Sequence, residues 1–159
     1  MLLFDRRTLL MLPLALSACG FTPVYAPGGG ATQLQNSITV AEPSTRNGFL
    51  ITQRIEEKLG RAVDPDYRMT LSVSTGQQNV AVDREGSTTR FNIIGRANYS
   101  LIETSTGRVV TSGKVENFTG YSAAGTTVAT VAARRDAQRR LMILLADQIV
   151  TRTLVADLG

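Results

Sequence analysis

Few residues of this chain are of a type that does chemistry. It contains one cysteine, Cys19, and neither histidine nor tryptophan. A single thiol cannot form a disulfide within the chain, and without histidine the commonest general base and metal ligand is missing. The acidic pairs Glu56–Glu57 and Asp64/Asp66 lie where a helix face or a turn accounts for them. No spacing of serine or lysine indicates a nucleophile with its base, so the sequence argues against an enzyme.

Cys19 stands at the end of a segment typical of a secretory signal peptide. Arg6 and Arg7 form a positive start, an apolar run covers residues 9–16, and small residues precede the cysteine. The run is too short to cross a bilayer as a mature helix, which takes about 20 residues. A buried N-terminal helix is the alternative, but the glycines and prolines after Cys19 favour a signal peptide over residues 1–18. The arginine pair leaves both a plain basic start and a twin-arginine export signal open.

The residues Leu16-Ser17-Ala18-Cys19 resemble the lipobox of bacterial lipoproteins. In that class the chain is cut before the cysteine, the thiol receives a diacylglycerol, and the new amine receives an acyl chain such as palmitate. The resemblance implies lipid attachment at Cys19 and no metal or other cofactor. More than one acyl chain makes such a membrane anchor stable. Gly20 follows the cysteine where an Asp would favour the inner membrane, so the resemblance implies the outer membrane, on its periplasmic side.

The chain after the cleavage point is long enough for one domain. The whole chain carries a net charge of +4, and cleavage removes two arginines and one aspartate, which leaves about +3. The pI of about 9.7 is compatible with nucleic-acid binding. The small charge and the export signal argue against it. We expect a lipidated, flexible tether over residues 19–35, rich in Gly and Pro, and a single domain over residues 36–159.

Hydrophobic periodicity predicts an α+β domain. Residues 37–40 are a short strand candidate, and Ile51, Ile55 and Leu59 recur at helical spacing before Gly60, which is typical of a helix end. The order of elements implies a two-layer sandwich. We expect a mostly antiparallel sheet of about four strands, packed by two helices of which the C-terminal one is long.

A meander of strands occupies the middle of the chain. Alternating apolar residues predict half-buried strands over residues 67–73 and 91–101, and a turn over residues 104–107 leads to a return strand over residues 108–119. The alternation changes phase near Gly76. The sequence therefore predicts a β-bulge or a turn at that glycine.

The last part of the chain predicts one long helix. Residues 121–125 break the strand pattern, and a helix of about 29 residues, about 45 Å long, begins near Thr126. We expect its C-terminal half to pack on the core and its basic N-terminal half to project past the sheet. The apolar positions expected to share one face are Val128, Val131, Leu141, Met142, Leu145, Ala146 and Ile149.

The segment Cys19-Gly20-Phe21, a Pro/Gly tether, one helix, a strand meander and a basic C-terminal helix together resemble the LptE family. These are the lipopolysaccharide-assembly lipoproteins of Gram-negative outer membranes. The stretch 132–137 and the helix that it enters resemble the alphaproteobacterial branch. The resemblance implies a non-enzymatic lipoprotein that plugs the LptD β-barrel, supports its assembly and interacts with lipopolysaccharide in transit. The layout also fits an accessory lipoprotein of another envelope lipid-transport system or a general envelope-binding module.

Lipopolysaccharide carries phosphates, which arginine binds through charge-assisted hydrogen bonds. Arginines occur around the loop over residues 83–87, on the long strand and on the last helix. These candidate contacts to lipopolysaccharide or to the barrel are Arg84, Arg90, Arg96, Arg134, Arg135, Arg139 and Arg140. Each could instead be a solvated charge, and the sequence leaves these alternatives open.

Overall fold

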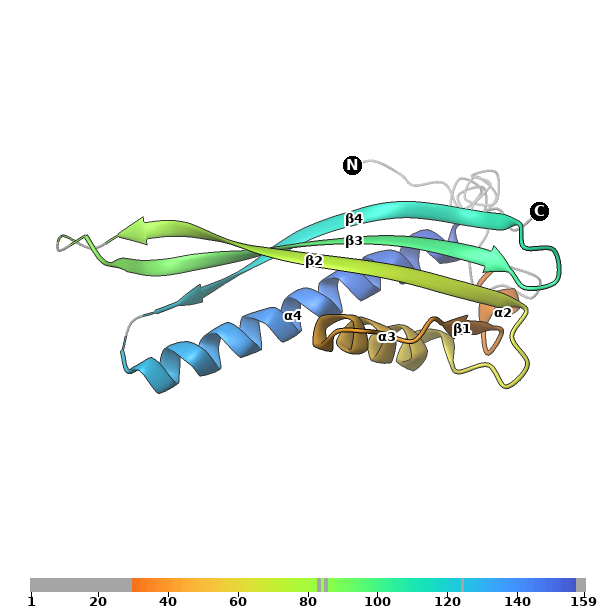
Figure 1. Ribbon diagram of the computed structural model, residues 1–159, viewed down its shortest axis with the longest axis horizontal. Coiled ribbons are helices and arrows are strands. Elements are labelled where there is room, and N and C mark those ends of the chain that lie inside the picture. The colour runs from red at the N-terminus through yellow and green to blue at the C-terminus, as the bar shows by residue number, and fades with distance from the viewer. Residues whose placement is uncertain (1–29, 83, 85, 124, 157–159) are drawn as a thin grey trace, which may run out of the picture.

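The computed structural model describes residues 30–82, 84, 86–123 and 125–156. The expected signal peptide, Cys19 and most of the expected tether lie outside these residues. The elements are α2 (Gly30–Leu34), β1 (Ile38–Val40), α3 (Arg46–Leu59), β2 (Tyr67–Val82), β3 (Thr88–Glu103), β4 (Val109–Ser122) and α4 (Thr127–Leu154) (Figure 1).

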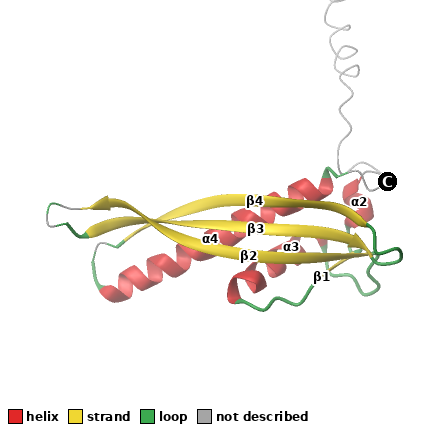
Figure 2. Ribbon diagram, turned by 45° about the horizontal axis from the view of Figure 1, so that its top comes forward, coloured by secondary structure: helices red, strands yellow, loops and turns green. Residues whose placement is uncertain are grey.

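The strands form one sheet with helices on one face only. Its order is β1-β2-β3-β4, in which β1 runs parallel to β2 and the other neighbours are antiparallel. β1 and β2 are parallel because α3 carries the chain back between them, as a crossover must. α3 and α4 lie on the same face and leave the opposite face open (Figure 2). The predicted two-layer α+β sandwich is confirmed.

The core lies between this sheet and the two helices. Alternate residues of β3, among them Ala97 and Leu101, are buried against α4. At Gly95 of β3, α4 lies very close to the sheet. A Cβ at this position would lie 2.9 Å from Leu145 Cδ1 and 3.0 Å from Leu141 Cδ2. The missing side chain therefore allows α4 to cross the sheet closely.

Local capping sets the ends of the helices. Thr45 accepts a hydrogen bond from the N–H of Gly48 at 3.0 Å and caps α3, and Thr126 caps α4 in the same way. Gly60 follows α3 with φ 78°, a conformation that favours glycine, so the predicted helix end is confirmed.

The structure corrects two predictions about the strands. β2 continues through Gly76, which pairs with Ile94, and the register shifts only between Asn79 and Val82. The predicted irregularity at Gly76 is wrong because both faces of this part of β2 are exposed, so no core enforces the alternation. Tyr121 and Ser122 belong to β4 rather than to a break.

Residues 30–34, which the sequence placed in the tether, form the one-turn helix α2 with Leu34 buried in the core. A helix this short has no periodicity to detect.

The N-terminal half of α4 diverges from the sheet. The helix has 28 residues, close to the expected length, and Ala137 is the first of its fully buried residues. Val128 and Val131 are 79% and 43% exposed, so their expected place on the core face is wrong. The expectation that this half projects past the sheet is also wrong, because the β2–β3 hairpin extends further than the start of α4. The hairpin and the helix diverge from each other, like the two prongs of a fork (Figure 1).

Candidate functional site

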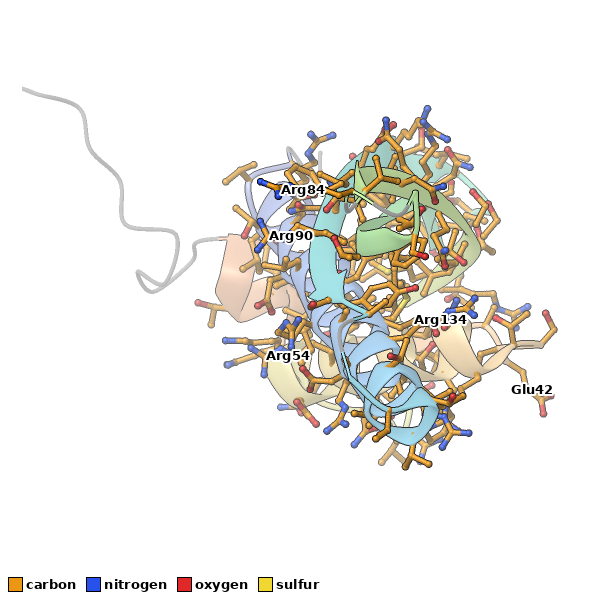
Figure 3. All side chains as sticks on the ribbon, turned by 90° about the vertical axis from the view of Figure 1, so that its left-hand side faces the viewer. Glu42, Arg54, Arg84, Arg90 and Arg134 are labelled. Carbon is orange, nitrogen blue, oxygen red and sulfur yellow. The ribbon has the colours of Figure 1, made fainter. Side chains whose placement is uncertain are left out.

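The candidate arginines gather mostly at one end of the molecule, which we call the fork end. It consists of the distal hairpin, residues 79–91, and the first part of α4, residues 127–136. Arg84 lies in the hairpin loop and Arg90 on β3, and both side chains are exposed. Seen from this end, they lie on one side of the molecule and Arg134 lies on the opposite side of α4 (Figure 3).

The arginines of α4 form a cluster in sequence but not in space. Arg134 lines a small hollow with residues 75–77 of β2, whereas Arg139 faces α3 beside Leu50. Arg140 donates to the carbonyl of Gly120 at the edge of β4, at 3.3 Å. Successive residues turn by about 100° around a helix, so neighbouring arginines point in different directions. The structure therefore separates Arg134 from Arg139 and Arg140, although the three are close in sequence.

Three of the candidates are engaged by carboxylates of the chain itself. Asp136 pairs with Arg140, and its other oxygen lies 4.0 Å from Arg139. Arg96 donates two hydrogen bonds to Glu116, at 2.8 and 3.0 Å, across the open face of the sheet. These bonds lower the pKa of Glu116 and raise the pKa of Arg96.

The remaining candidates are electrostatically free. Within the described part of the chain, no hydrogen bond or ion pair engages these side chains, which are all exposed. They are Arg84, Arg90, Arg134 and Arg135. A guanidinium without an internal carboxylate keeps its full capacity to bind an external anion. Helical spacing could have indicated the pairs of Asp136 with Arg139 and Arg140, which are three and four positions away. The Arg96–Glu116 pair depends on the register of β3 with β4, which the sequence does not show.

The open face of the sheet is polar, as the alternation predicts. Its residues form hydrogen bonds to one another, such as that from Asn98 to Ser72 at 3.2 Å. Apolar Phe118, 60% exposed, is an exception. It lies beside Ile94 in a shallow hollow of about 430 Å³, which sequence reasoning did not identify. The open face is therefore suited to contact with water or with polar groups of another protein.

A metal-binding cluster and a membrane-spanning helix are both absent from the described residues. They contain no group of three or more His, Cys, Asp or Glu side chains that could hold a metal ion. Among them no helix is both long and apolar enough to span a bilayer.

The fold is that of a class of bacterial lipoproteins. A lipoprotein from Caulobacter crescentus matches with TM-score 0.65 and 23% identity, over 79% of this chain and 93% of that one. Rare lipoprotein B from Shewanella oneidensis matches with TM-score 0.57 and 16% identity, over 73% and 90%. A minor lipoprotein from Acinetobacter baumannii matches with TM-score 0.53 and 13% identity, over 74% and 87%. A comparison with curated protein sequences finds no match.

The family follows from the sequence match. The model of LptE, described as lipopolysaccharide-assembly, matches residues 35–153, which is most of the chain and all of β1 to β4. The chain therefore belongs to the LptE family of lipopolysaccharide-assembly lipoproteins, and the resemblance seen in its sequence is confirmed. Its role lies in lipopolysaccharide transport and in the biogenesis of the outer membrane.

Proposed function

We propose that this protein is a non-catalytic outer-membrane lipoprotein that plugs the LptD β-barrel. In this role it supports assembly of the barrel and the insertion of lipopolysaccharide into the outer leaflet. The lipid on Cys19 holds the domain at the periplasmic side of the membrane. Membership of the LptE family carries the proposal.

The shape and polarity of the domain support a place inside a barrel. The interior of large outer-membrane barrels is polar, whereas their outer surface is apolar. The open face of the sheet is polar and carries several charged side chains, among them Arg68, Lys114 and the Arg96–Glu116 ion pair. α4 is about 42 Å long at 1.5 Å per residue, which is comparable with the height of a membrane including its headgroup regions. The elongated domain therefore suits a tall polar lumen.

The free arginines of the fork end suit the phosphates of lipopolysaccharide. In this proposal Arg84 and Arg90 contact the ligand from the hairpin side, and Arg134 and Arg135 from the side of α4. Arg134 lies on the opposite side of the fork end from Arg84 and Arg90, and this separation suits a ligand with more than one phosphate (Figure 3). Acidic residues of the barrel are the alternative partners for the same side chains.

Depletion and purification test the proposal. The lipidated protein, isolated from outer membranes of its host, should co-purify with a barrel of the size of LptD. Depleting it should leave that barrel immature and reduce lipopolysaccharide at the cell surface. Normal barrel maturation and normal surface lipopolysaccharide after depletion would contradict the proposal. Chemical cross-linking in intact cells separates it from an accessory role in another lipid transporter by the mass of the partner.

A further inference from the structure

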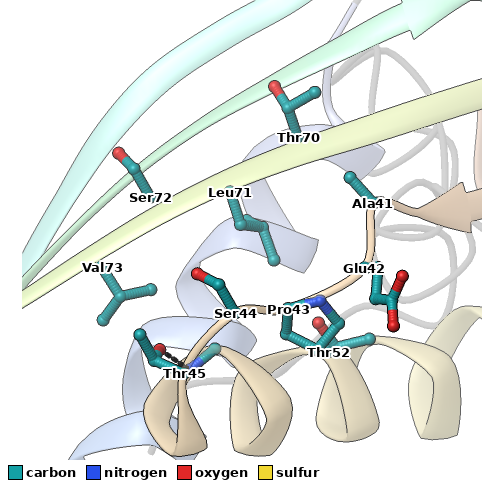
Figure 4. A pocket seen from close by; sticks show the side chains of 11 residues that line it. Ala41, Glu42, Pro43, Ser44, Thr45, Thr52, Thr70, Leu71, Ser72 and Val73 are labelled. Carbon is teal, nitrogen blue, oxygen red and sulfur yellow. Dashed lines mark hydrogen bonds between the residues drawn. The ribbon is translucent and has the colours of Figure 1, made fainter.

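β2 is an edge strand over most of its length. β1 covers only its beginning, where Ile38–Val40 pairs with Tyr67–Met69. The last bond of this pairing runs from the N–H of Ala41 to the carbonyl of Met69, at 2.8 Å. The chain then leaves the sheet toward α3 (Figure 4). Among the described residues, no strand covers this side of β2 beyond Met69.

The backbone groups on this open side can be identified by alternation. The N–H of Tyr67 donates to the carbonyl of Ser37 at 3.0 Å, and the carbonyl of Met69 accepts from Ala41. Odd-numbered residues of β2 therefore direct their N–H and C=O groups toward the β1 side. At the next four such positions, the backbone N–H and C=O groups form no hydrogen bond within the described chain. These positions are Leu71, Val73, Thr75 and Gln77.

The opposite edge of the sheet, along β4, is partly protected by the chain itself. Arg152 donates to the outward carbonyl of Lys114 at 2.8 Å. Arg140 donates to the outward carbonyl of Gly120 at 3.3 Å. The N–H of Phe118 is bonded to the side chain of the preceding residue at 2.8 Å. The chain thus satisfies three outward backbone groups of β4 and none of those at Leu71, Val73, Thr75 and Gln77 of β2.

The sequence of the β2 edge also lacks the usual protection. Native sheets guard free edges with charged side chains, prolines or bulges, because an unguarded edge pairs with other chains. From Thr70 to Val82 the strand contains no charged residue and no proline. Its irregularity lies only at the tip, between Asn79 and Val82. The stretch Leu71–Gln77 is therefore open to pairing.

A cavity lies beside the start of this edge. It has a volume of about 280 Å³ and is bounded by β2 and by the segment that leads from β1 into α3 (Figure 4). Leu71 and Val73 line it, and so does Thr52 of α3. Thr52 is 8% exposed, and its hydroxyl oxygen has no hydrogen-bond partner. The cavity offers room and a polar contact for one side chain of an added strand.

We propose that Leu71–Gln77 binds an extended segment of the barrel partner, which adds to the sheet as a further strand. The identity of this partner rests on the function proposed above. An extended polypeptide fits because its own N–H and C=O groups repeat at the spacing of the edge. The strand itself carries no charge from Thr70 to Val82, so backbone hydrogen bonds rather than charges of its own side chains hold the partner. The docked strand lies on the same side of β2 as β1 and extends the sheet from the point where β1 ends.

Site-specific cross-linking tests this arrangement in the full lipoprotein in native outer membranes. A photo-reactive residue is placed at Ser74 or at Gln78, both exposed on β2. Paired strands keep a fixed register, so the two positions should attach to one segment of the barrel at sites about four residues apart. The same probe at Ser112 on the β4 edge, also exposed, is the matched control and should attach to no such segment.

The outcomes separate this inference from the proposed function. If the barrel co-purifies but the links are absent, scattered, or directed to a second copy of this chain, the docking proposal is overturned while the function stands. If no barrel co-purifies, both are overturned. Links to one segment in register support both.

A pair of proline variants provides an independent measurement. Thr75→Pro removes an N–H that points to the open edge, so it removes a docking donor and no bond of the internal ladder. Ser112→Pro does the same at the β4 edge and serves as the control. Thr75→Pro should recover roughly tenfold less barrel than Ser112→Pro, with similar thermal unfolding of the two free proteins. Equal recovery would overturn the proposal.

Discussion

Arg54 of α3 donates hydrogen bonds to both carboxylate oxygens of Asp147 of α4, at 2.9 and 3.3 Å. The two residues are 93 positions apart in the chain, and the pair ties together the helices that cover the sheet. The pKa of Arg54 is raised, first by this hydrogen bond and then by the one to Glu57. The bidentate geometry requires these faces of α3 and α4 to lie opposite each other.

Breaking this pair should loosen the helix layer only slightly. Both side chains are partly exposed, and such pairs contribute little to stability. Arg54→Met should lower the midpoint of thermal unfolding by less than Leu141→Ala does, because Leu141 is fully buried. Circular dichroism during heating measures both. A larger loss for Arg54→Met than for Leu141→Ala would contradict this assignment.

Filling the close approach at Gly95 should destabilise the fold. Gly95→Ala places a Cβ against Leu141 and Leu145 and should cost about 1–3 kcal/mol through overpacking. Gly76→Ala is the control, because nothing lies within 4 Å of a Cβ there, and it should be neutral or slightly stabilising. Urea denaturation measures both variants. Equal stabilities would show that α4 can move away from the sheet at no cost.

The free arginines should bind phosphate and the paired ones should not. Arg84→Gln and Arg134→Gln should each weaken binding of purified lipopolysaccharide to the soluble domain by roughly tenfold. Arg96→Gln should change it little, because Glu116 already occupies that guanidinium. The binding should also weaken with added salt. Equal losses in all three variants would indicate a general effect of positive charge rather than specific contacts.

Acid should weaken the sheet through Glu116. The hydrogen bond from Arg96 lowers the pKa of this carboxyl below its ordinary value of 4.5. Its contribution to stability is therefore complete above the pKa of the unfolded chain and is lost as pH falls through the lower pKa of the folded one. Glu116→Gln should lose this part of the acid dependence, and so should Arg96→Gln. Urea midpoints at pH 6 and pH 3 measure it, and an unchanged acid dependence in both variants would contradict the assignment.

The lipid anchor is testable by mass alone. Protein isolated from its native host should begin at Cys19 and carry a diacylglycerol and an N-linked acyl chain. Cys19→Ser should abolish both the modification and membrane retention, since the thiol is the attachment point. Intact-mass spectrometry of the membrane fraction measures this. An unprocessed Met1, or an unmodified Cys19, would refute the lipoprotein assignment of the N-terminus.

Local sequence is sufficient to predict a helix or a strand wherever one face of that element packs against the core. Ile51, Ile55 and Leu59 identify α3, and the alternation around Ala97 identifies β3, because burial of one face imposes a period on the chain. The same reasoning fails at Gly76, Val128 and α2. At the first two no core face exists to impose a period, and α2 is too short to display one.

The sequence by itself determined the order of elements, the fold class and the family, together with the expectation of a lipid on Cys19. Tertiary structure alone decided that Arg96 is paired, because only the pairing of β3 with β4 brings Arg96 and Glu116 together. It also decided which edge of the sheet is open. That difference arises because Arg140 and Arg152 of α4 reach β4, whereas nothing in the described chain reaches the outward groups of β2 beyond Met69.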